Sequence, residues 1–279
     1  MNLQDWNRFI RPSIWAFGLG VFLIGVLASH IFLFQHIIGA VIAILLCTAS
    51  ITLNHYYDYE TDRKSKQLYR FPVASEKISR KFAISFSIAV MLLSIVLAIS
   101  FLSTLVVGIV IFANFMIYSY SAPPFRIKER KYIETFWNGL AYGSIAYYLG
   151  ILISNIPLTI YNHLLGIIPF LIAASGHILL QVRDIKDDKK AKVKTTSTNL
   201  GLKTMKRISG AFVILSGIII IFLAIVGFLN YLAWLAIAAG VLVAIEHKRM
   251  KKDVTKSYLK LQLIYVIGGI LFILSIIKF

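Results

Sequence analysis

Two short acidic patterns are the parts of this sequence best suited to chemistry. Asn54, Asp58 and Asp62 follow one another at intervals of four residues. Asp184 and Asp188 repeat that interval later in the chain. Side chains four residues apart lie on the same face of a helix, where two carboxylates repel each other unless a cation lies between them. Because carboxylate and amide oxygens are typical ligands of Mg²⁺, we predict that these five residues bind Mg²⁺.

Each pattern alone also fits the solvated end of a helix, and it is the repetition that favours a metal site. Gln181 lies about one helical turn before Asp184, so a polar residue precedes the acids in the second pattern as well. Two such rows facing each other would form a cage for several Mg²⁺ ions, which suits a diphosphate better than a small anion. The predicted catalytic residues are Asp58, Asp62, Asp184 and Asp188.

A proline pair restricts the chain just before two basic residues. Proline fixes the backbone φ angle, so Pro123 and Pro124 stiffen the turn and direct Arg126 and Lys128 towards the membrane surface. Cations at that position would neutralise a diphosphate as it leaves. The alternative, which the sequence leaves open, is that these residues only attract lipid headgroups.

The composition excludes a soluble protein. Hydrophobic residues make up 58% of the 279 residues and charged residues 15%, and the mean hydropathy is +0.79. A soluble domain has roughly 45–50% apolar and about 25% charged residues. A soluble enzyme, a disordered chain and a disulfide-rich secreted domain are therefore excluded. The single cysteine, Cys47, lies in an apolar run, and we predict that it is a small buried side chain.

Nine segments are apolar and close to the ~20 residues that a helix needs to cross a bilayer. This pattern predicts an all-α, polytopic membrane protein with nine transmembrane helices, formed by a single domain over residues 1–279. The predicted segments lie near 12–30, 33–53, 82–102, 104–120, 133–154, 161–182, 208–228, 231–246 and 261–277.

Almost all of the basic residues lie on one side of these segments. The 29 lysines and arginines exceed the 12 acidic residues and give a net charge of +17. Of the 29 basic residues, only Lys278 falls on the other side. The positive-inside rule then places the protein in the cell membrane, with its N-terminus and the loops that carry both acidic patterns in the cytoplasm. Because the charge lies between apolar segments, membrane lipids or an anionic substrate are better partners than nucleic acid.

These motifs together resemble the UbiA family of intramembrane prenyltransferases. The family has Asn-x3-Asp-x3-Asp after its second span and Asp-x3-Asp after its sixth, and both occur here. Arg11-Pro12 and the segments 70–79 and 120–128 also resemble family motifs. The sequence departs from the family pattern at Glu76 and Lys192, where glycine is usual.

The resemblance implies an all-helical fold around a central cavity that is capped by cytoplasmic loops and opens sideways to lipid. It also implies Mg²⁺-dependent transfer of a prenyl chain from an isoprenyl diphosphate donor to a small-molecule or lipid acceptor. Either Arg126 or Lys128 takes the role of the family's lysine. The residues that we expect to bind the substrates are Asn54, Tyr120, Arg126, Lys128, Arg63, Arg70, Asn138 and Gln181.

Breaking the C–O bond of such a donor would leave an allylic carbocation, which aromatic faces can stabilise. Asn138 and His177 are expected either to contact the acceptor or to form hydrogen bonds between helices. The aromatic candidates, each of which also fits a packing role, are Tyr56, Tyr57, Tyr118, Tyr120, Trp137 and Tyr142.

Three other functions compete with prenyl transfer. A transporter of cations or phosphorylated metabolites would place ionisable residues near the membrane midplane, but no acid lies at the centre of a predicted span. A membrane scaffold explains the basic residues but not the two acidic rows. A lyase or cyclase would lose diphosphate without an acceptor. Within the family, quinone precursors, archaeal glycerol phosphate lipids and porphyrin-type rings all remain open as acceptors.

Overall fold

The structure of the protein is a computed structural model, which describes residues 2–64, 67–190, 196–249 and 254–277. Side chains are described in these ranges except at 184, 186–190, 247–249 and 254–259. These residues form helices and contain no β-strand. In chain order the helices are α1 (Leu3–Ile10), α2 (Pro12–Ser29), α3 (Phe34–Tyr57), α4 (Tyr59–Asp62), η1 (Leu68–Arg70), α5 (Arg80–Phe101), α6 (Thr104–Ser121), η2 (Ile127–Glu129), α7 (Ile133–Asn138), η3 (Gly139–Ile145), α8 (Ala146–Leu152), α9 (Ile160–Lys190), α10 (Thr196–Ile225), α11 (Leu232–Arg249) and α12 (Val254–Ile276).

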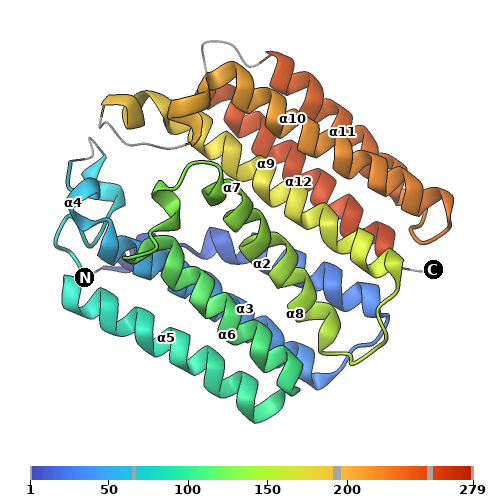
Figure 1. The fold of residues 1–279 in the computed structure, drawn as a ribbon, viewed down its shortest axis with the longest axis horizontal. Helices are drawn as coiled ribbons and strands as arrows, with labels where there is room; N and C mark the ends of the chain where they lie inside the picture. Colours follow the sequence, from blue (N-terminus) through green and yellow to red (C-terminus); the bar gives the residue numbers. More distant parts are fainter. Residues whose placement is uncertain (1, 65–66, 191–195, 250–253, 278–279) are drawn as a thin grey trace.

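The long helices form two groups, with α2, α7 and α8 between them (Figure 1). On one side α3, α5 and α6 contact one another, and on the other side α9 contacts α10 and α11 contacts α12. The short helix α4, the loop that follows α6 and the start of α10 lie together at the left of Figure 1. This end of the bundle therefore brings together three segments that are far apart in the sequence.

The outer face of α5 consists of exposed apolar side chains. Ile88, Leu92, Val96 and Ile99 recur at helical spacing, and each exposes 47–63% of its surface. A row of exposed apolar side chains is unfavourable in water and favourable in lipid. The bundle is therefore built to present apolar side chains on its outside as well as in its core.

Within the part of the chain that the structure describes, six helical stretches are long and apolar enough to cross a membrane. They are Leu3–Ser29, Phe34–Tyr57, Arg80–Phe101, Thr104–Ser121, Ile160–Arg183 and Thr196–Ile225. The apolar parts of α11 and α12, Leu232–Glu246 and Lys260–Ile276, are shorter. The remaining predicted segment, 133–154, consists of α7, the π-helical segment η3 and α8 in succession. The all-helical prediction is confirmed for the described residues, and the count of nine spans stays a prediction.

Glycines allow α2 to approach α8 closely, and η3 to approach α9 closely. A Cβ on Gly25 of α2 would lie 2.1 Å from Tyr147 O, and a Cβ on Gly150 of α8 would lie 2.2 Å from Phe22 O. A Cβ on Gly143 would lie 2.5 Å from Pro169 O of α9. Gly139, four residues before Gly143, also packs closely, since a Cβ there would lie 3.0 Å from the Phe170 ring. Small residues thus fix the centre of the bundle. Cys47 is buried, as predicted.

Replacing Gly150 with alanine tests this close crossing. The new methyl group would meet the backbone of α2, which cannot move aside as a side chain can, so we expect Gly150→Ala to lower the free energy of unfolding by about 2 kcal/mol. Gly108→Ala in α6 is the matched control, because a Cβ there meets nothing within 4 Å. Unfolding of the purified protein in detergent measures both, and equal stability of the two variants would contradict the crossing.

Candidate active site

A cavity of about 1760 Å³ lies between α2, α3, η3 and helices α9 to α12. Small-molecule pockets usually measure about 300–1,000 Å³, so this one has room for lipid-sized molecules. At Gly176, Gly217 and Gly240 of its wall an added Cβ would meet nothing within 4 Å. The glycines therefore leave open space along the wall. Most of the lining residues are apolar. The polar residues of the lining include Arg8, Arg11, Asn54, Tyr69, Arg70, Tyr120, Asn138, His177, Gln181 and Arg183.

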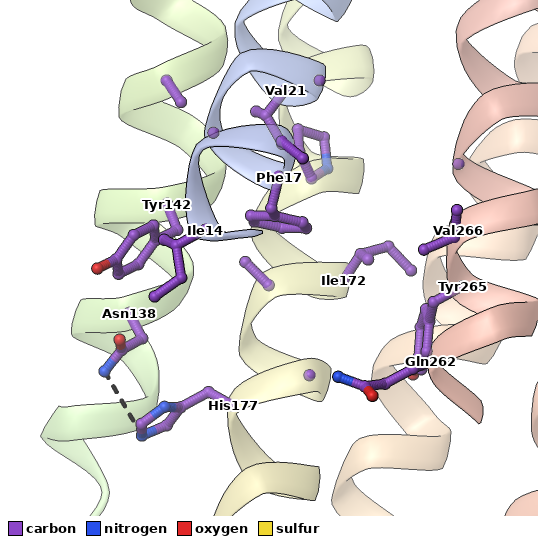
Figure 2. A pocket seen from close by; sticks show the side chains of 18 of the residues that line it. Ile14, Phe17, Val21, Asn138, Tyr142, Ile172, His177, Gln262, Tyr265 and Val266 are labelled. Carbon is purple, nitrogen blue, oxygen red and sulfur yellow. Dashed lines mark hydrogen bonds between the residues drawn. The ribbon is translucent and has the colours of Figure 1, made fainter. Parts of the chain in front are cut away.

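The two sides of the cavity differ in their polar groups (Figure 2). Asn138 and His177 point towards each other, with Ile14 and Phe17 of α2 nearby. Across α9, the hydroxyl group of Tyr265 on α12 lies 2.9 Å from Ser175 Oγ. The first pair faces the cavity with groups that can contact a polar substrate, whereas the Tyr265 contact ties α12 to α9.

The first acidic pattern lies where α3 ends. Asp58 interrupts the helix at φ −91° and ψ 4°, and α4 starts at the next residue. Asn54, Asp58 and Asp62 therefore do not lie in one uninterrupted helix, because aspartate favours such a helix end over a helix interior. The helical bonding continues through the break, since Asp58 N donates to Asn54 O at 2.8 Å and Asp62 N donates to Asp58 O at 2.8 Å.

Lys128 reaches this pattern from the loop after α6. Its Nζ donates to Asn54 Oδ1 at 3.2 Å and also to Asp58 Oδ1. Arg126 is more distant, with its guanidinium 3.9 Å from Asp58 Oδ1 and its Nε 2.5 Å from Glu129 Oε1. Burial lowers the pKa of Lys128, and the charge of Asp58 opposes that shift. The structure thus gives Lys128 the closer contact of the two cations.

The oxygens around Lys128 are those that a divalent cation would use. The ammonium group lies between an amide oxygen of Asn54 and a carboxylate oxygen of Asp58, so a positive charge is already accommodated there. Asp62 adds a second carboxylate, 3.9 Å from His55 Nδ1. Burial raises the pKa of Asp62, which a nearby cation would offset. The donor set of this first row therefore fits Mg²⁺.

The second acidic pattern lies at the end of α9, but the side chains of Asp184 and Asp188 are outside the described residues. Lys192 is outside them as well. Among the side chains that are described, no three His, Cys, Asp or Glu residues lie close enough to hold a metal ion. Whether the second row completes the cage stays a prediction.

A buried carboxylate joins α7 to the start of α10. Glu134 exposes 2% of its surface, and its Oε1 accepts hydrogen bonds from Thr196 N at 2.7 Å and from Thr196 Oγ1 at 2.5 Å. Tyr132 N in turn donates to Thr196 Oγ1 at 2.8 Å. Sequence analysis missed Glu134 because its partner is distant in the chain, and no spacing rule connects them.

This contact is part of a closed ring of hydrogen bonds that reaches the cavity. Ser197 N donates to Gln181 Oε1 at 3.2 Å, and Gln181 Nε2 lies 2.8 Å from His177 Nε2. His177 Nε2 lies 3.5 Å from Asn138 Nδ2, which donates to Glu134 O at 2.8 Å (Figure 2). Both roles proposed for Asn138 and His177 are compatible with this ring, because they link helices and also line the cavity.

Other predicted substrate residues divide into two groups. Tyr120 and Arg70 line the cavity, as do the aromatic candidates Trp137 and Tyr142. Arg63 instead points to the loop, where it lies 3.3 Å from Tyr59 Oη and 3.8 Å from Glu76 Oε1. The candidates outside the cavity lining are Tyr56, Tyr57 and Tyr118. Three arginines that no prediction assigned to the site also line it, namely Arg8, Arg11 and Arg183.

Comparison with known proteins identifies the family. A model described as the UbiA prenyltransferase family matches residues 13–274. The chain belongs to the UbiA prenyltransferase family. The resemblance drawn from the motifs is therefore confirmed over most of the sequence.

Individual relatives of this UbiA-family protein agree with that result. The chain is 26% identical over 204 residues to a digeranylgeranylglyceryl phosphate synthase from Methanosphaera stadtmanae, which covers 72% of this chain and 71% of the relative. It is similar to a UbiA homologue from Archaeoglobus fulgidus bound to DMAPP and Mg²⁺, with a TM-score of 0.74, 24% identity and coverage of 98% and 100%. A homologue from Aeropyrum pernix K1 gives a TM-score of 0.78, 18% identity and coverage of 96% and 99%.

One departure from the family pattern has a structural cost. Glu76 stands where the family usually has glycine, and its φ angle is 60°. Glycine adopts this left-handed conformation without strain, whereas other residues pay about 1–2 kcal/mol. In compensation, the Glu76 carboxylate accepts a hydrogen bond from Tyr59 Oη at 3.2 Å and pairs with Arg63. The loop therefore keeps the left-handed backbone conformation that glycine would adopt at this position.

Substituting Glu134 tests the ring. Glu134→Ala would leave Thr196 N without its buried acceptor, so we expect the free energy of unfolding to fall by about 3 kcal/mol. Glu134→Gln keeps an acceptor oxygen and should lose less. Glu60→Ala, at an exposed position of α4, is the control. Unfolding in detergent measures all three, and a Glu134→Ala protein as stable as the control would show that the contact contributes little.

Proposed function

We propose that this protein transfers a prenyl chain from an isoprenyl diphosphate to a lipid acceptor in a Mg²⁺-dependent reaction. The observation that carries the proposal is the position of Asn54, at once a lining residue of a large apolar cavity and a partner of Lys128 beside Asp58. A prenyl diphosphate has the matching division into an apolar tail and an anionic head. Membership of the UbiA family supports the same reaction.

The proposed roles follow from the charges at this end of the cavity. Mg²⁺ bound by Asn54, Asp58, Asp62 and the second row would neutralise the diphosphate. Lys128 and Arg126 would add positive charge as the C–O bond breaks and its electron pair leaves with the diphosphate oxygen. Both cations lie beside Asp58, so they would be within reach of a diphosphate bound through Mg²⁺ at that residue.

The allylic cation left behind would face Tyr120, Trp137 and Tyr142, which line the cavity. Their ring faces can stabilise it by cation–π attraction. A hydroxyl group of the acceptor then attacks the cation and releases a proton. The ring that holds Asn138 and His177 presents two polar groups to the cavity, where they can orient that hydroxyl group.

A glyceryl phosphate lipid is the acceptor that we propose. The relative from Methanosphaera stadtmanae is a digeranylgeranylglyceryl phosphate synthase, whose product is a phosphate with two prenyl chains. A cavity of about 1760 Å³ has room for two such chains side by side. A lyase or cyclase would need no second chain, and a transporter would need no diphosphate chemistry.

We also propose nine membrane spans, a single domain over residues 1–279, and cytoplasmic placement of the site. Six stretches meet the length and hydropathy that spanning requires, and α7–α8, α11 and α12 supply three more helical segments. The loops that bear Lys128 and the acidic residues lie at one end of the bundle (Figure 1). That end carries the basic residues which the positive-inside rule places in the cytoplasm.

Asp58→Asn tests the metal site. The variant keeps the shape of the side chain but loses the charge that would hold Mg²⁺ and Lys128, so we expect prenyl transfer to fall by a factor of about a hundred or more. Glu60→Gln, at an exposed position two residues away, is the matched control and should keep its activity. Transfer that continues in Asp58→Asn with Mg²⁺ removed would refute the proposed metal site.

The products distinguish the competing functions. Purified protein is incubated with Mg²⁺ and radiolabelled geranylgeranyl diphosphate, with and without geranylgeranylglyceryl phosphate. We expect label in a lipid phosphate with two prenyl chains only when the acceptor is present. Release of diphosphate with a free prenyl alcohol or alkene, unaffected by the acceptor, would indicate a lyase or cyclase. An unchanged donor would contradict an enzyme of either kind.

A further inference from the structure

The N-terminal helix α1 is held in place by its aromatic face. Trp6 and Phe9 pack with Ile78, Ala83 and Phe86 of the loop before α5 and of α5 itself. The Phe9 ring also stacks on His55 of α3, with 5.9 Å between ring centroids. This packing anchors α1 beside the helix that carries the first acidic pattern, so the remaining face of α1 has a fixed direction.

That remaining face belongs to the cavity wall. Asn7, Arg8 and Arg11 all line the cavity, the first two from α1 and Arg11 from the residue that follows it. Arg11 follows α1 with a φ angle of 45°, directly before Pro12, so the chain turns there into α2. Arg8 lies 3.9 Å from Asp5 and over the ring of Tyr69, at 5.4 Å from its centroid.

Arg11 is the cation of this wall whose N–H groups are available for a ligand. Its side chain makes no hydrogen bond or ion pair with another residue that the structure describes, although it lines the cavity. The charges that act on it include Asp62 and two further arginines, Arg70 and Arg183, which also line the cavity. Like charges gathered on one wall repel, so an anion bound among them would be stabilised.

These arginines are separate from the cations already assigned to the diphosphate. Lys128 and Arg126 approach Asp58 from the loop after α6. Arg8 and Arg11 instead come from α1 and the turn into α2. The proposed acceptor carries a phosphate that is not the leaving group, so the reaction brings two anionic groups to the same end of the cavity. The wall offers a second set of cations for the second anion.

We propose that Arg11, assisted by Arg8, binds the phosphate monoester of the acceptor lipid. A guanidinium group matches two phosphate oxygens with two parallel N–H groups, which fixes the orientation as well as the charge of the ligand. The acceptor would thereby be held with its phosphate at α1 and its chain in the cavity. This inference rests on the proposed function, and it names the part of the acceptor that the site recognises.

Binding without turnover is the first test. Geranylgeranylglyceryl phosphate and the same lipid lacking its phosphate, geranylgeranylglycerol, are titrated against the purified protein without donor or Mg²⁺. Binding is followed by the fluorescence of tryptophan, of which Trp137 lines the cavity. Arg11→Gln should weaken binding of the phosphorylated lipid by about tenfold to a hundredfold and leave the other lipid unaffected.

Two further variants show whether the guanidinium shape and position matter. Arg11→Lys keeps the charge but loses the paired N–H groups, so it should recover only part of the affinity. Arg207→Gln, at an exposed position of α10, removes the same charge away from the cavity and should bind like the wild type. If Arg11→Gln and Arg207→Gln weakened binding of the phosphorylated lipid equally, the loss would be due to net charge alone, and the proposal would be overturned.

Kinetics then separates the acceptor from the donor. Arg11→Gln should raise the KM for the phosphorylated acceptor and leave the KM for the diphosphate donor unchanged. An increase in the donor KM instead, or equal loss with both acceptors, would overturn the assignment, because Arg11 would then serve the diphosphate or the fold. Arg11-dependent binding of the lipid phosphate without any prenyl transfer would keep the anion site and refute the proposed function.

Discussion

Placing charge at the end of an apolar cavity is the constraint on which the rest of this structure depends. A charged group removed from water is costly unless an opposite charge and hydrogen bonds compensate it. Lys128 lies between oxygens of Asn54 and Asp58, and Arg126 lies nearby. These contacts compensate the buried charges and place both cations beside the acids.

The surrounding elements fix that group of charges in place. The break at Asp58 turns the chain from α3 into α4 while the backbone hydrogen bonds continue. α1 packs its aromatic side chains against α3 and α5, and the ring from Glu134 to Asn138 fastens the start of α10 to α7 and α9. Segments that are far apart in the sequence thus meet at one end of the bundle, where each depends on the others.

Sequence alone reached the helical class, the family and most of the cavity's polar end, because periodic spacing and composition are local properties. Asn54 and Gln181 were predicted from their spacing to the acids, and Tyr120 and Asn138 after the resemblance to the family had been drawn. All four line the cavity. The spacing of Asn54, Asp58 and Asp62 did not reveal the break of the helix at Asp58. Glu134 was missed because its hydrogen bonds are to Thr196, far along the chain. Arg11 was named as part of a family-like motif, but its place in the cavity wall depends on how α1 packs.

Four glycine positions in the cavity wall have a consequence for the hydrocarbon tail. At Gly176, Gly217, Gly240 and Gly269 an added Cβ would meet nothing within 4 Å. A larger side chain at any of these positions would therefore reduce the cavity space available to a tail without changing Asp58 or Lys128. Tolerance for tail length and the chemistry of the headgroup can change independently in such a protein.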